Sequence, residues 1–172
     1  MSSDQRIPIT RPFLPPKQNL IRLLEGVYDR NWLTNQGPLV TEFEKKLSEY
    51  VGNNELKFVT NGTIALQIAL QAVFDKGEVI TTPYSYIATT SSILWEGCTP
   101  VFADIDEKTL NVDPANIAKL IGDQTKAILV THVYGNACEI DQIESIAKKH
   151  NVPVIYDAAH CFGTKYRGKS IY

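Results

Sequence analysis

Apolar residues in the early part of the chain recur at helical spacing. They occupy one face of a helix over residues 40–51, at Val40, Phe43, Leu47 and Val51, and Gly52 follows as a stop signal. A second helix is expected at Gln18–Tyr28, inside an opening that is otherwise proline-rich and irregular. The pattern predicts an N-terminal segment, residues 1–39, with one helix, and a domain that fills residues 40–172.

From about residue 56 onward, short β-rich apolar runs alternate with helical stretches. Strands are expected at Leu56–Thr60, Glu78–Thr82, Thr99–Ala103, Ala127–Thr131 and Val152–Tyr156. Helices are expected at Thr63–Phe74, Ile87–Gly97, Asp113–Ile121 and Glu139–His150. Asn61 or Thr63 can cap the first of these helices, and Asp113 followed by Pro114 is a helix-start signal. The alternation predicts an α/β fold with a mostly parallel sheet covered on both faces, in three layers.

Ligands of parallel α/β sheets gather beyond the carboxyl ends of the strands. Polar and aromatic residues stand at these places, in the segments Asn61–Thr63, Pro83–Tyr86, Tyr134–Asn136 and Asp157–His160. Gly62 and Thr63 fall at a strand-to-helix turn, where backbone amides favour phosphate. A plain turn with a cap is the alternative there. Neither GxGxxG nor GxxxxGK[ST] is present, which leaves a phosphate on a smaller cofactor.

Two further strand-end features bear on chemistry. An aromatic residue after the strand at 78–82 can lie flat on a heterocycle, although it can equally fill the core. Asp157 ends an apolar strand, where its charge needs a cationic partner such as a protonated pyridine nitrogen, unless it only caps the next helix. His160 can reach a cofactor oxygen or merely satisfy a backbone carbonyl.

Composition narrows the classes of partner. The net charge of −2 gives no electrostatic grip on nucleic acid or an anionic membrane. The sequence has neither an apolar run of about 20 residues nor a signal-peptide core, so the cytoplasm is expected. The cysteines, Cys98, Cys138 and Cys161, lack zinc-like spacing and no metal site is expected. Cys161 follows His160 directly, which leaves a reactive thiol to weigh against a small buried residue.

Four motifs in order carry a family resemblance: NGTIALQIAL, TTPYSYIATTSSILWEGCTPVFADID, THVYGNACEID and VIYDAAHCFGTKYRGK. With the earlier NWLTNQGPLVTEFEKKLSEYVG, they make residues 12–169 resemble the DegT/DnrJ/StrS family of nucleotide-sugar aminotransferases. These are pyridoxal phosphate (PLP) enzymes of fold type I, in the aspartate aminotransferase superfamily. The resemblance implies the first part of the large PLP-binding domain, with the rest of that domain and the small domain absent.

Carried over by position, the resemblance implies a role for each strand-end residue. Gly62 and Thr63 would hold the PLP phosphate, and Tyr86 would stack on the ring. Asp157 would bind the pyridine nitrogen and His160 would approach the 3-oxygen. Asn136 would line the pocket, and the segment around 32–37 would approach the sugar or a dimer interface.

The resemblance also implies the reaction and its partners. An amino group would pass from an amino acid, typically glutamate, to a keto-deoxysugar nucleotide. The motifs are most similar to those of members that act on sugars carried on dTDP, and the enzyme would be a homodimer. The lysine that forms a Schiff base with PLP is expected beyond Tyr172, in a motif resembling Ser-Phe-x-x-x-Lys. Lys165 and Lys169 belong to a surface turn and are not expected to replace it, so this chain alone is expected to be inactive. The alternatives are a non-catalytic protein that binds PLP or a nucleotide sugar, and a dehydratase-like relative without the lysine.

Overall fold

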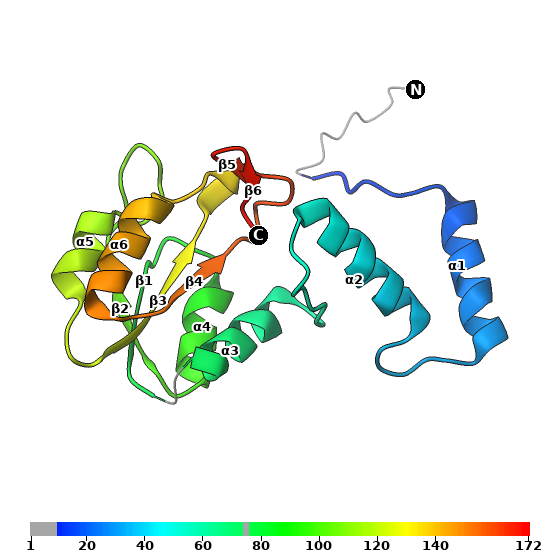
Figure 1. Ribbon diagram of the computed structural model, residues 1–172, viewed down its shortest axis with the longest axis horizontal. Helices are drawn as coiled ribbons and strands as arrows, with labels where there is room; N and C mark the ends of the chain where they lie inside the picture. The colour runs from blue at the N-terminus through cyan, green and yellow to red at the C-terminus, as the bar shows by residue number, and fades with distance from the viewer. Residues whose placement is uncertain (1–9, 74–75) are drawn as a thin grey trace, which may run out of the picture. The chain divides into compact units, whose positions relative to one another are not determined.

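The computed structural model describes residues 10–73 and 76–172, and the chain divides into two compact units. The first unit ends at Lys46 and the second is Leu47–Tyr172. Helix α1 (Lys17–Arg30) lies in the first unit, and helix α2 (Pro38–Val51) crosses the division (Figure 1). The two helices expected here, at Gln18–Tyr28 and at residues 40–51, are therefore confirmed. The units part at 46/47, inside α2, and the division expected at residue 39 stays a prediction.

A four-stranded parallel sheet organises the second unit. Its strands are β1 (Glu78–Thr81), β2 (Thr99–Phe102), β3 (Thr125–Thr131) and β4 (Val154–Asp157), in the order β2-β1-β3-β4. Each strand was expected within two residues of its observed ends. The seven residues of β3 include six buried ones, as a central strand covered on both faces requires.

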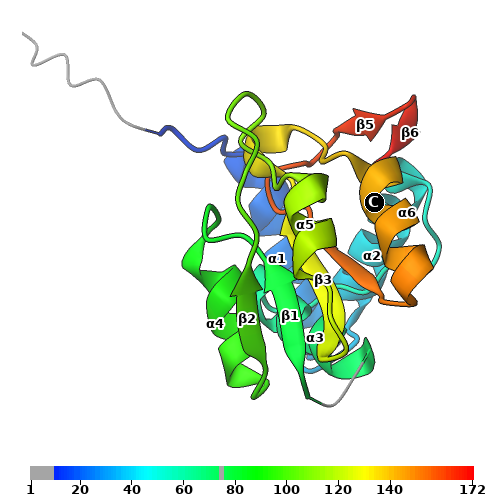
Figure 2. The ribbon, with the colours of Figure 1, turned by 90° about the vertical axis from the view of Figure 1, so that its left-hand side faces the viewer.

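Helices cover both faces of this sheet (Figures 1 and 2). Helices α3 (Gly62–Val73) and α4 (Ile87–Trp95) lie on one face, and α5 (Pro114–Leu120) and α6 (Ile140–His150) lie on the other. The α3/α4 core is formed by Leu66, Leu70, Val79, Ile93, Cys98, Ala127 and Leu129. The α5/α6 core includes Ile80, Ile117, Ile128, Val130, Ile143 and Ala147. The three-layer α/β fold expected from the sequence is therefore confirmed.

Local signals explain where several helices begin and end. The Asp113 carboxylate accepts a hydrogen bond from Ala115 N at 2.9 Å, with Pro114 in the first turn of α5. Asn61 Oδ1 accepts one from Ile64 N at 3.0 Å, so Asn61 caps α3. Helix α6 has an acidic first turn and a basic last turn, which suits its dipole. The expected end of α3 at Phe74 lies outside the described residues.

The strand expected at Leu56–Thr60 is wrong: these residues form neither strand nor helix. A strand requires a neighbour that accepts and donates its backbone hydrogen bonds. In the described part of the chain, β4 pairs only with β3 and β2 pairs only with β1, and neither pairs with this segment. The pattern of apolar residues had the right period, but it carries no information on the pairing partner.

A short hairpin closes the chain. Strands β5 (Lys165–Tyr166) and β6 (Lys169–Ser170) pair antiparallel, and Arg167 and Gly168 turn between them with positive φ angles of 49° and 81°. Lys165 and Lys169 lie in these strands on either side of the turn, and both are exposed, as expected of a surface segment. Among the described residues, no helix combines the length and the apolar character that crossing a bilayer demands.

Candidate active site

The strand order reverses between β1 and β3, because β2 lies beyond β1 and β4 lies beyond β3. Crevices of parallel sheets form outside the carboxyl ends of the strands at such a reversal. A cavity of about 330 Å³ lies there, lined by Pro83, Tyr84, Ser85, Tyr86, Thr131, Val133, Tyr134 and His160. These residues follow β1, end or follow β3, and follow β4, so three separate connections form its walls.

Tyr86 and His160, two of the residues singled out from the sequence, line this cavity together. Tyr86 precedes α4 with extended backbone angles, and its side chain is 73% exposed, so it does not fill the core. His160 Nδ1 accepts a hydrogen bond from the backbone N–H of Tyr134 at 3.3 Å. The His160 and Tyr134 rings are parallel within 6°, with centroids 6.3 Å apart. An exposed aromatic face and an oriented imidazole therefore share one hollow.

Asp157 ends β4 with both carboxylate oxygens held by this chain. Oδ1 accepts a hydrogen bond from Ala159 N at 3.0 Å, and Oδ2 accepts one from Thr89 Oγ1 at 3.4 Å. Thr89 is fully buried in α4. Residues 158–164 form turns and no helix, so Asp157 does not cap a following helix. Its carboxylate is fixed in direction by donors from two different elements.

Gly62 and Thr63 form the first turn of α3, but residues 56–60 before them form no strand, so this is not the expected strand-to-helix turn, and they do not line the 330 Å³ cavity. A Cβ placed on Gly62 would meet no heavy atom within 4 Å, so the space beside this turn is open. Ser92 Oγ donates to the Thr63 carbonyl at 3.5 Å. Helix α4 thus bonds to two parts of the predicted site. Its Ser92 contacts the start of α3, and its Thr89 contacts Asp157.

Asn136 stands apart from the other predicted residues. Asn136 follows the short 3-10 helix η1 (Val133–Gly135) and is exposed. It is not among the described residues that line the cavity. Its backbone carbonyl accepts a hydrogen bond from Asn111 Nδ2 at 3.2 Å. The residue that projects at the cavity from this segment is Tyr134 instead, whose hydroxyl lies 3.1 Å from that of Tyr84. In the sequence, the only sign that Tyr134 lines the cavity is that an aromatic residue stands directly before Gly135, just after a predicted strand.

A buried histidine lies next to this site. The His132 Nδ1 accepts a hydrogen bond from Cys138 N at 3.0 Å, and its ring stacks on Tyr156 with centroids 5.1 Å apart. Burial lowers the pKa of His132, and the nearby charge of Asp157 opposes that shift only in part. His132 is therefore held neutral beneath the sheet end.

The three cysteines are buried and free, and Cys161 is completely enclosed. Burial raises the pKa of all three thiols, that of Cys138 to about 12. A thiol that is both inaccessible and protonated is a poor nucleophile. The structure therefore favours the small buried residue over the reactive one for Cys161.

In the first unit, Trp32 and Gly37 line a separate cavity of about 210 Å³ with Val27, Arg30 and the start of α2. This is the segment that the resemblance assigned to the sugar or to a dimer interface. Its walls combine an indole, a guanidinium and aliphatic side chains.

Comparison with known proteins decides the family. Residues 16–171 match the sequence profile described as the DegT/DnrJ/EryC1/StrS aminotransferase family. The chain belongs to this family. It is 45% identical over 170 residues to the dTDP-4-amino-4,6-dideoxy-D-glucose transaminase of Escherichia coli, covering 99% of this chain and 46% of that protein. It is 41% identical to the GDP-perosamine synthase of Caulobacter vibrioides, covering 98% of this chain and 46% of that protein.

Solved structures share the fold of this chain. DesI in the presence of its TDP-sugar product superposes with a TM-score of 0.90 at 34% identity, covering 98% of this chain and 43% of that one. NtdA from Bacillus subtilis with bound cofactor PMP gives 0.78 at 30% identity, covering 98% and 41%. The chain thus spans just under half the length of the relatives it matches.

Proposed function

We propose that the protein transfers an amino group from an amino acid, glutamate, to the keto group of a deoxysugar carried on dTDP, with PLP as its cofactor, in the cytoplasm. The observation that carries this proposal is the crevice at the strand-order reversal. An exposed Tyr86, an oriented His160 and a fixed Asp157 meet near it in a chain of an aminotransferase family.

The residues present fit pyridoxal phosphate. No heavy atom lies within 4 Å of a Cβ placed on Gly62, so a phosphate can approach the start of α3 closely on this side, while Asn61 caps the Ile64 amide. Asp157 offers a carboxylate whose hydrogen bonds hold it in one orientation, and such a group pairs with a protonated pyridine nitrogen. Tyr86 offers an aromatic face that nothing in the core occupies.

In this proposal, each residue acts through one atom or group. Gly62 and Thr63 bind the phosphate, Tyr86 stacks on the ring, and Asp157 keeps the pyridine nitrogen protonated. When bound, PLP supplies an electron sink that makes the α-proton of an amino acid acidic. His160 approaches the 3-oxygen, while Asn136 lies close enough in sequence to Tyr134 to border a larger ligand. The lysine that completes the chemistry is not assigned to any residue of this chain.

The sugar and the assembly are inferred from relatives and from the surface. The matched Escherichia coli protein is named for a dTDP-linked aminodideoxyglucose, and DesI was solved with a TDP-sugar. The outer surfaces of α3 and α4 expose Ile64, Ile68, Ile87, Leu94 and Trp95. An apolar surface of this kind is typical of an interface, which supports a homodimer.

Asp157→Asn tests the proposal in the intact protein. The neutral amide cannot hold a proton on the pyridine nitrogen, so amino transfer to a dTDP-4-keto-6-deoxysugar should fall by about a hundredfold or more. PLP affinity, measured from the visible absorbance of the bound cofactor, should weaken about tenfold. The matched control is Asp123→Asn, an exposed change before β3, at the opposite end of the sheet.

The control should behave as the wild type in both measurements. A wild-type protein that binds no PLP would overturn the proposed function. Equal activity in Asp157→Asn and Asp123→Asn would show that Asp157 does not have the proposed role at the pyridine nitrogen.

A further inference from the structure

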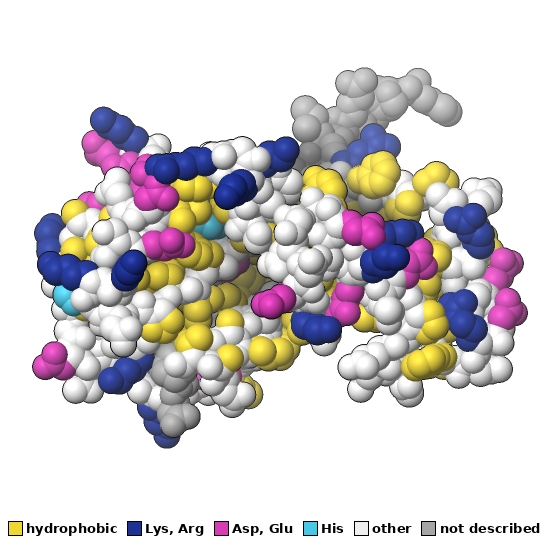
Figure 3. Space-filling view, in the orientation of Figure 1, with side chains coloured by type: hydrophobic (Ala, Val, Ile, Leu, Met, Phe, Trp, Pro, Cys, Tyr) yellow, Lys and Arg dark blue, Asp and Glu magenta, His cyan; other side chains and the backbone are white. Residues whose placement is uncertain are grey.

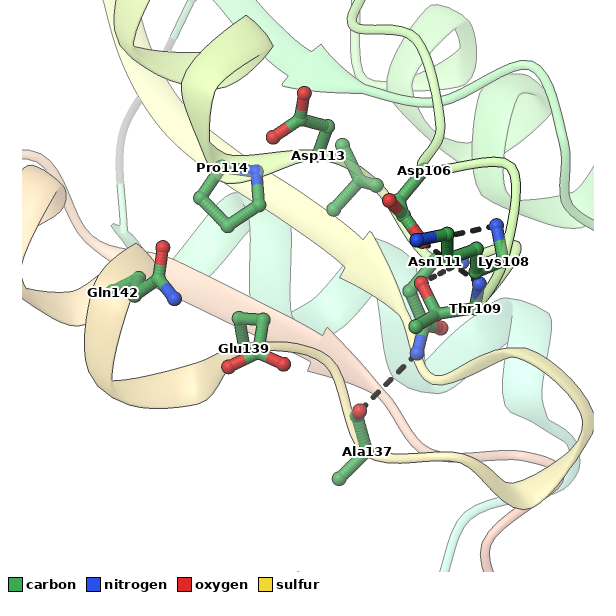
Figure 4. Close-up of a pocket in the computed structure, with 10 residues that line it drawn as sticks. Asp106, Lys108, Thr109, Asn111, Asp113, Pro114, Ala137, Glu139 and Gln142 are labelled. Carbon is green, nitrogen blue, oxygen red and sulfur yellow. Dashed lines mark hydrogen bonds between the residues drawn. The ribbon is translucent and has the colours of Figure 1, made fainter.

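Asn111 lies in the loop between β2 and α5, and every hydrogen-bonding group of its side-chain amide is used. The residue is buried. Its Oδ1 accepts a hydrogen bond from Val133 N at 2.8 Å, and its Nδ2 donates to the carbonyls of Asn136 and Ala137, both at 3.2 Å. Figure 4 shows the bond to Ala137 beside the polar hollow that Asn111 also lines. One side chain thus holds both ends of the segment 133–137.

The segment held in this way is strained. Tyr134 has φ 53° and ψ 26°, in the left-handed region that a bulky side chain rarely adopts, and Gly135 follows with φ 84°. Such a conformation persists only where surrounding contacts determine it. The contacts that do so here are the three hydrogen bonds of Asn111 and the bond from Thr164 Oγ1 to Gly135 O at 3.3 Å.

The strained residue directs its backbone N–H at His160. That N–H donates to His160 Nδ1 at 3.3 Å, so in the neutral ring the proton stands on Nε2. With Nδ1 occupied, His160 offers the cavity a hydrogen-bond donor and no acceptor. This histidine therefore suits a negatively charged ligand oxygen, which accepts a hydrogen bond. It does not suit a hydroxyl group that has to donate one.

We infer that Asn111 is a positioning residue for the site: by clamping segment 133–137 it fixes His160 in the Nε2–H tautomer, as a donor to an anionic oxygen of the bound ligand. Asn111 acts through the backbone of Tyr134 and does not itself touch the ligand. The ligand side of this inference rests on the proposed function, with the PLP 3-oxygen as the acceptor. The tautomer side rests on this chain alone.

The test reads the tautomer directly. Nitrogen NMR of the intact protein, labelled in its histidine rings and without PLP, should show the neutral ring of His160 with its proton on Nε2 and none on Nδ1. The signals are assigned by their loss in His160→Gln. In Asn111→Asp, an oxygen replaces Nδ2 and faces two carbonyls, so the clamp opens. His160 should then show a mixture of tautomers, and PLP should bind about tenfold more weakly.

Two controls separate positioning from a general structural role. Tyr134→Phe removes the hydroxyl contact to Tyr84 but keeps the backbone N–H, so the tautomer should stay as in the wild type. Asn116→Asp makes the same chemical change on α5, away from segment 133–137, and should alter neither measurement. If Asn111→Asp does not fold, Asn111→Gln replaces it as the test variant, because it keeps the amide group but displaces it. His160 should again show a mixture of tautomers.

The outcomes for the two proposals are distinct. A wild-type His160 that carries its proton on Nδ1, or a folded Asn111 variant with the wild-type tautomer, overturns the inference whatever PLP does. A wild-type protein with the Nε2–H tautomer that fails to bind PLP overturns the proposed function and leaves the positioning by Asn111 supported.

Discussion

Helices α4 and α6 cover opposite faces of the same sheet, but they are built in opposite ways. Helix α6 buries Ile143 and Ala147 and turns Lys148 and Lys149 outward. Helix α4 buries Thr89 and Ser92 beside Ile93, while Leu94 is 58% exposed and Trp95 80% exposed. Figure 3 shows charged side chains over α5 and α6 and apolar side chains gathered over α3.

The difference identifies which face serves the site. On the α5/α6 face, α6 buries apolar side chains against the sheet and exposes charged ones, the ordinary pattern of an amphipathic surface helix. On the α3/α4 face, the buried hydroxyls of α4 are used to hold Asp157 and the start of α3. The apolar side chains displaced outward form a surface of the kind that contacts another protein surface.

The largest effect that tests the comparison is expected from alanine substitutions at two neighbouring residues of α4, one buried and one exposed. Ile93→Ala empties a fully buried position against the sheet and should destabilise the fold by about 3 kcal/mol. Leu94→Ala, one residue later, should cost less than about 0.5 kcal/mol in the monomer because its side chain is already exposed. Urea denaturation at low protein concentration measures both. Equal losses would mean that α4 is not oriented as described.

A smaller effect is expected where α4 contacts Asp157. Thr89→Val keeps the shape of a fully buried side chain but removes the hydroxyl that donates to Asp157 Oδ2. The free energy of unfolding should fall by about 1 kcal/mol, since a partly buried carboxylate oxygen loses its donor. Thr90→Val, on the same helix and without this bond, is the matched control. An unchanged stability together with an unchanged PLP affinity would show that Thr89 does not hold Asp157.

His132 is a buried titrating ring that stacks on Tyr156 on the α5/α6 side of the sheet, and pH sharpens the comparison there. Burial lowers the pKa of His132 below its ordinary value of 6.5, so the unfolded chain takes up this proton at a higher pH than the fold does. The stability contribution is present above the ordinary pKa and is lost as pH falls from about 7 through the folded-state pKa.

The variant His132→Asn retains an acceptor for Cys138 N and removes the titrating ring. Urea midpoints measured between about pH 7 and pH 5 should therefore vary less with pH than in the wild type. Gln142→Asn, an exposed change on α6 that removes no titrating group, should keep the wild-type dependence on pH. An identical slope in His132→Asn would mean that His132 does not titrate differently on folding.

The smallest effect is expected on the charged outer surface. Arg167 of the hairpin turn forms an ion pair with Asp141 in the first turn of α6, and both side chains are at least half exposed. Arg167→Ala should change the free energy of unfolding by less than about 0.5 kcal/mol, because solvent screens exposed pairs. A loss above 1 kcal/mol, measured in the same urea series, would contradict the view that this outer face contributes little.

Sequence patterns predicted the order of elements well because these elements carry local signals. Helix α6 has apolar spacing, an acidic start and a basic end, and β3 is a nearly continuous apolar run. The orientation of α4 could not be predicted, because IATTSSILW is apolar on more than one side and its position depends on the polar atoms it meets. The false strand at Leu56–Thr60 failed for a related reason, since pairing is a property of two segments.

The site divides in the same way. The strand-end rule placed Tyr86, Asp157 and His160 correctly at the carboxyl ends, although their chemical roles remain predictions. The contact of Thr89 with Asp157 and the clamp formed by Asn111 were not predicted. Both join segments far apart in the sequence through side-chain hydrogen bonds, one for Thr89 and three for Asn111, and such bonds leave no periodic trace in a sequence.

The reversed strand order also has a kinetic consequence. The pairing of β1 with β2 encloses only α4, and the pairing of β3 with β4 encloses only η1 and α6. The pairing of β1 with β3 encloses α4, β2 and α5, so its closure costs the most chain entropy. Each outer pair can therefore form as a separate βαβ unit before the central pair joins them. In that order of assembly, the crevice lined by Tyr86, Tyr134 and His160 forms when β1 pairs with β3, because Tyr86 follows β1 while Tyr134 and His160 follow β3 and β4.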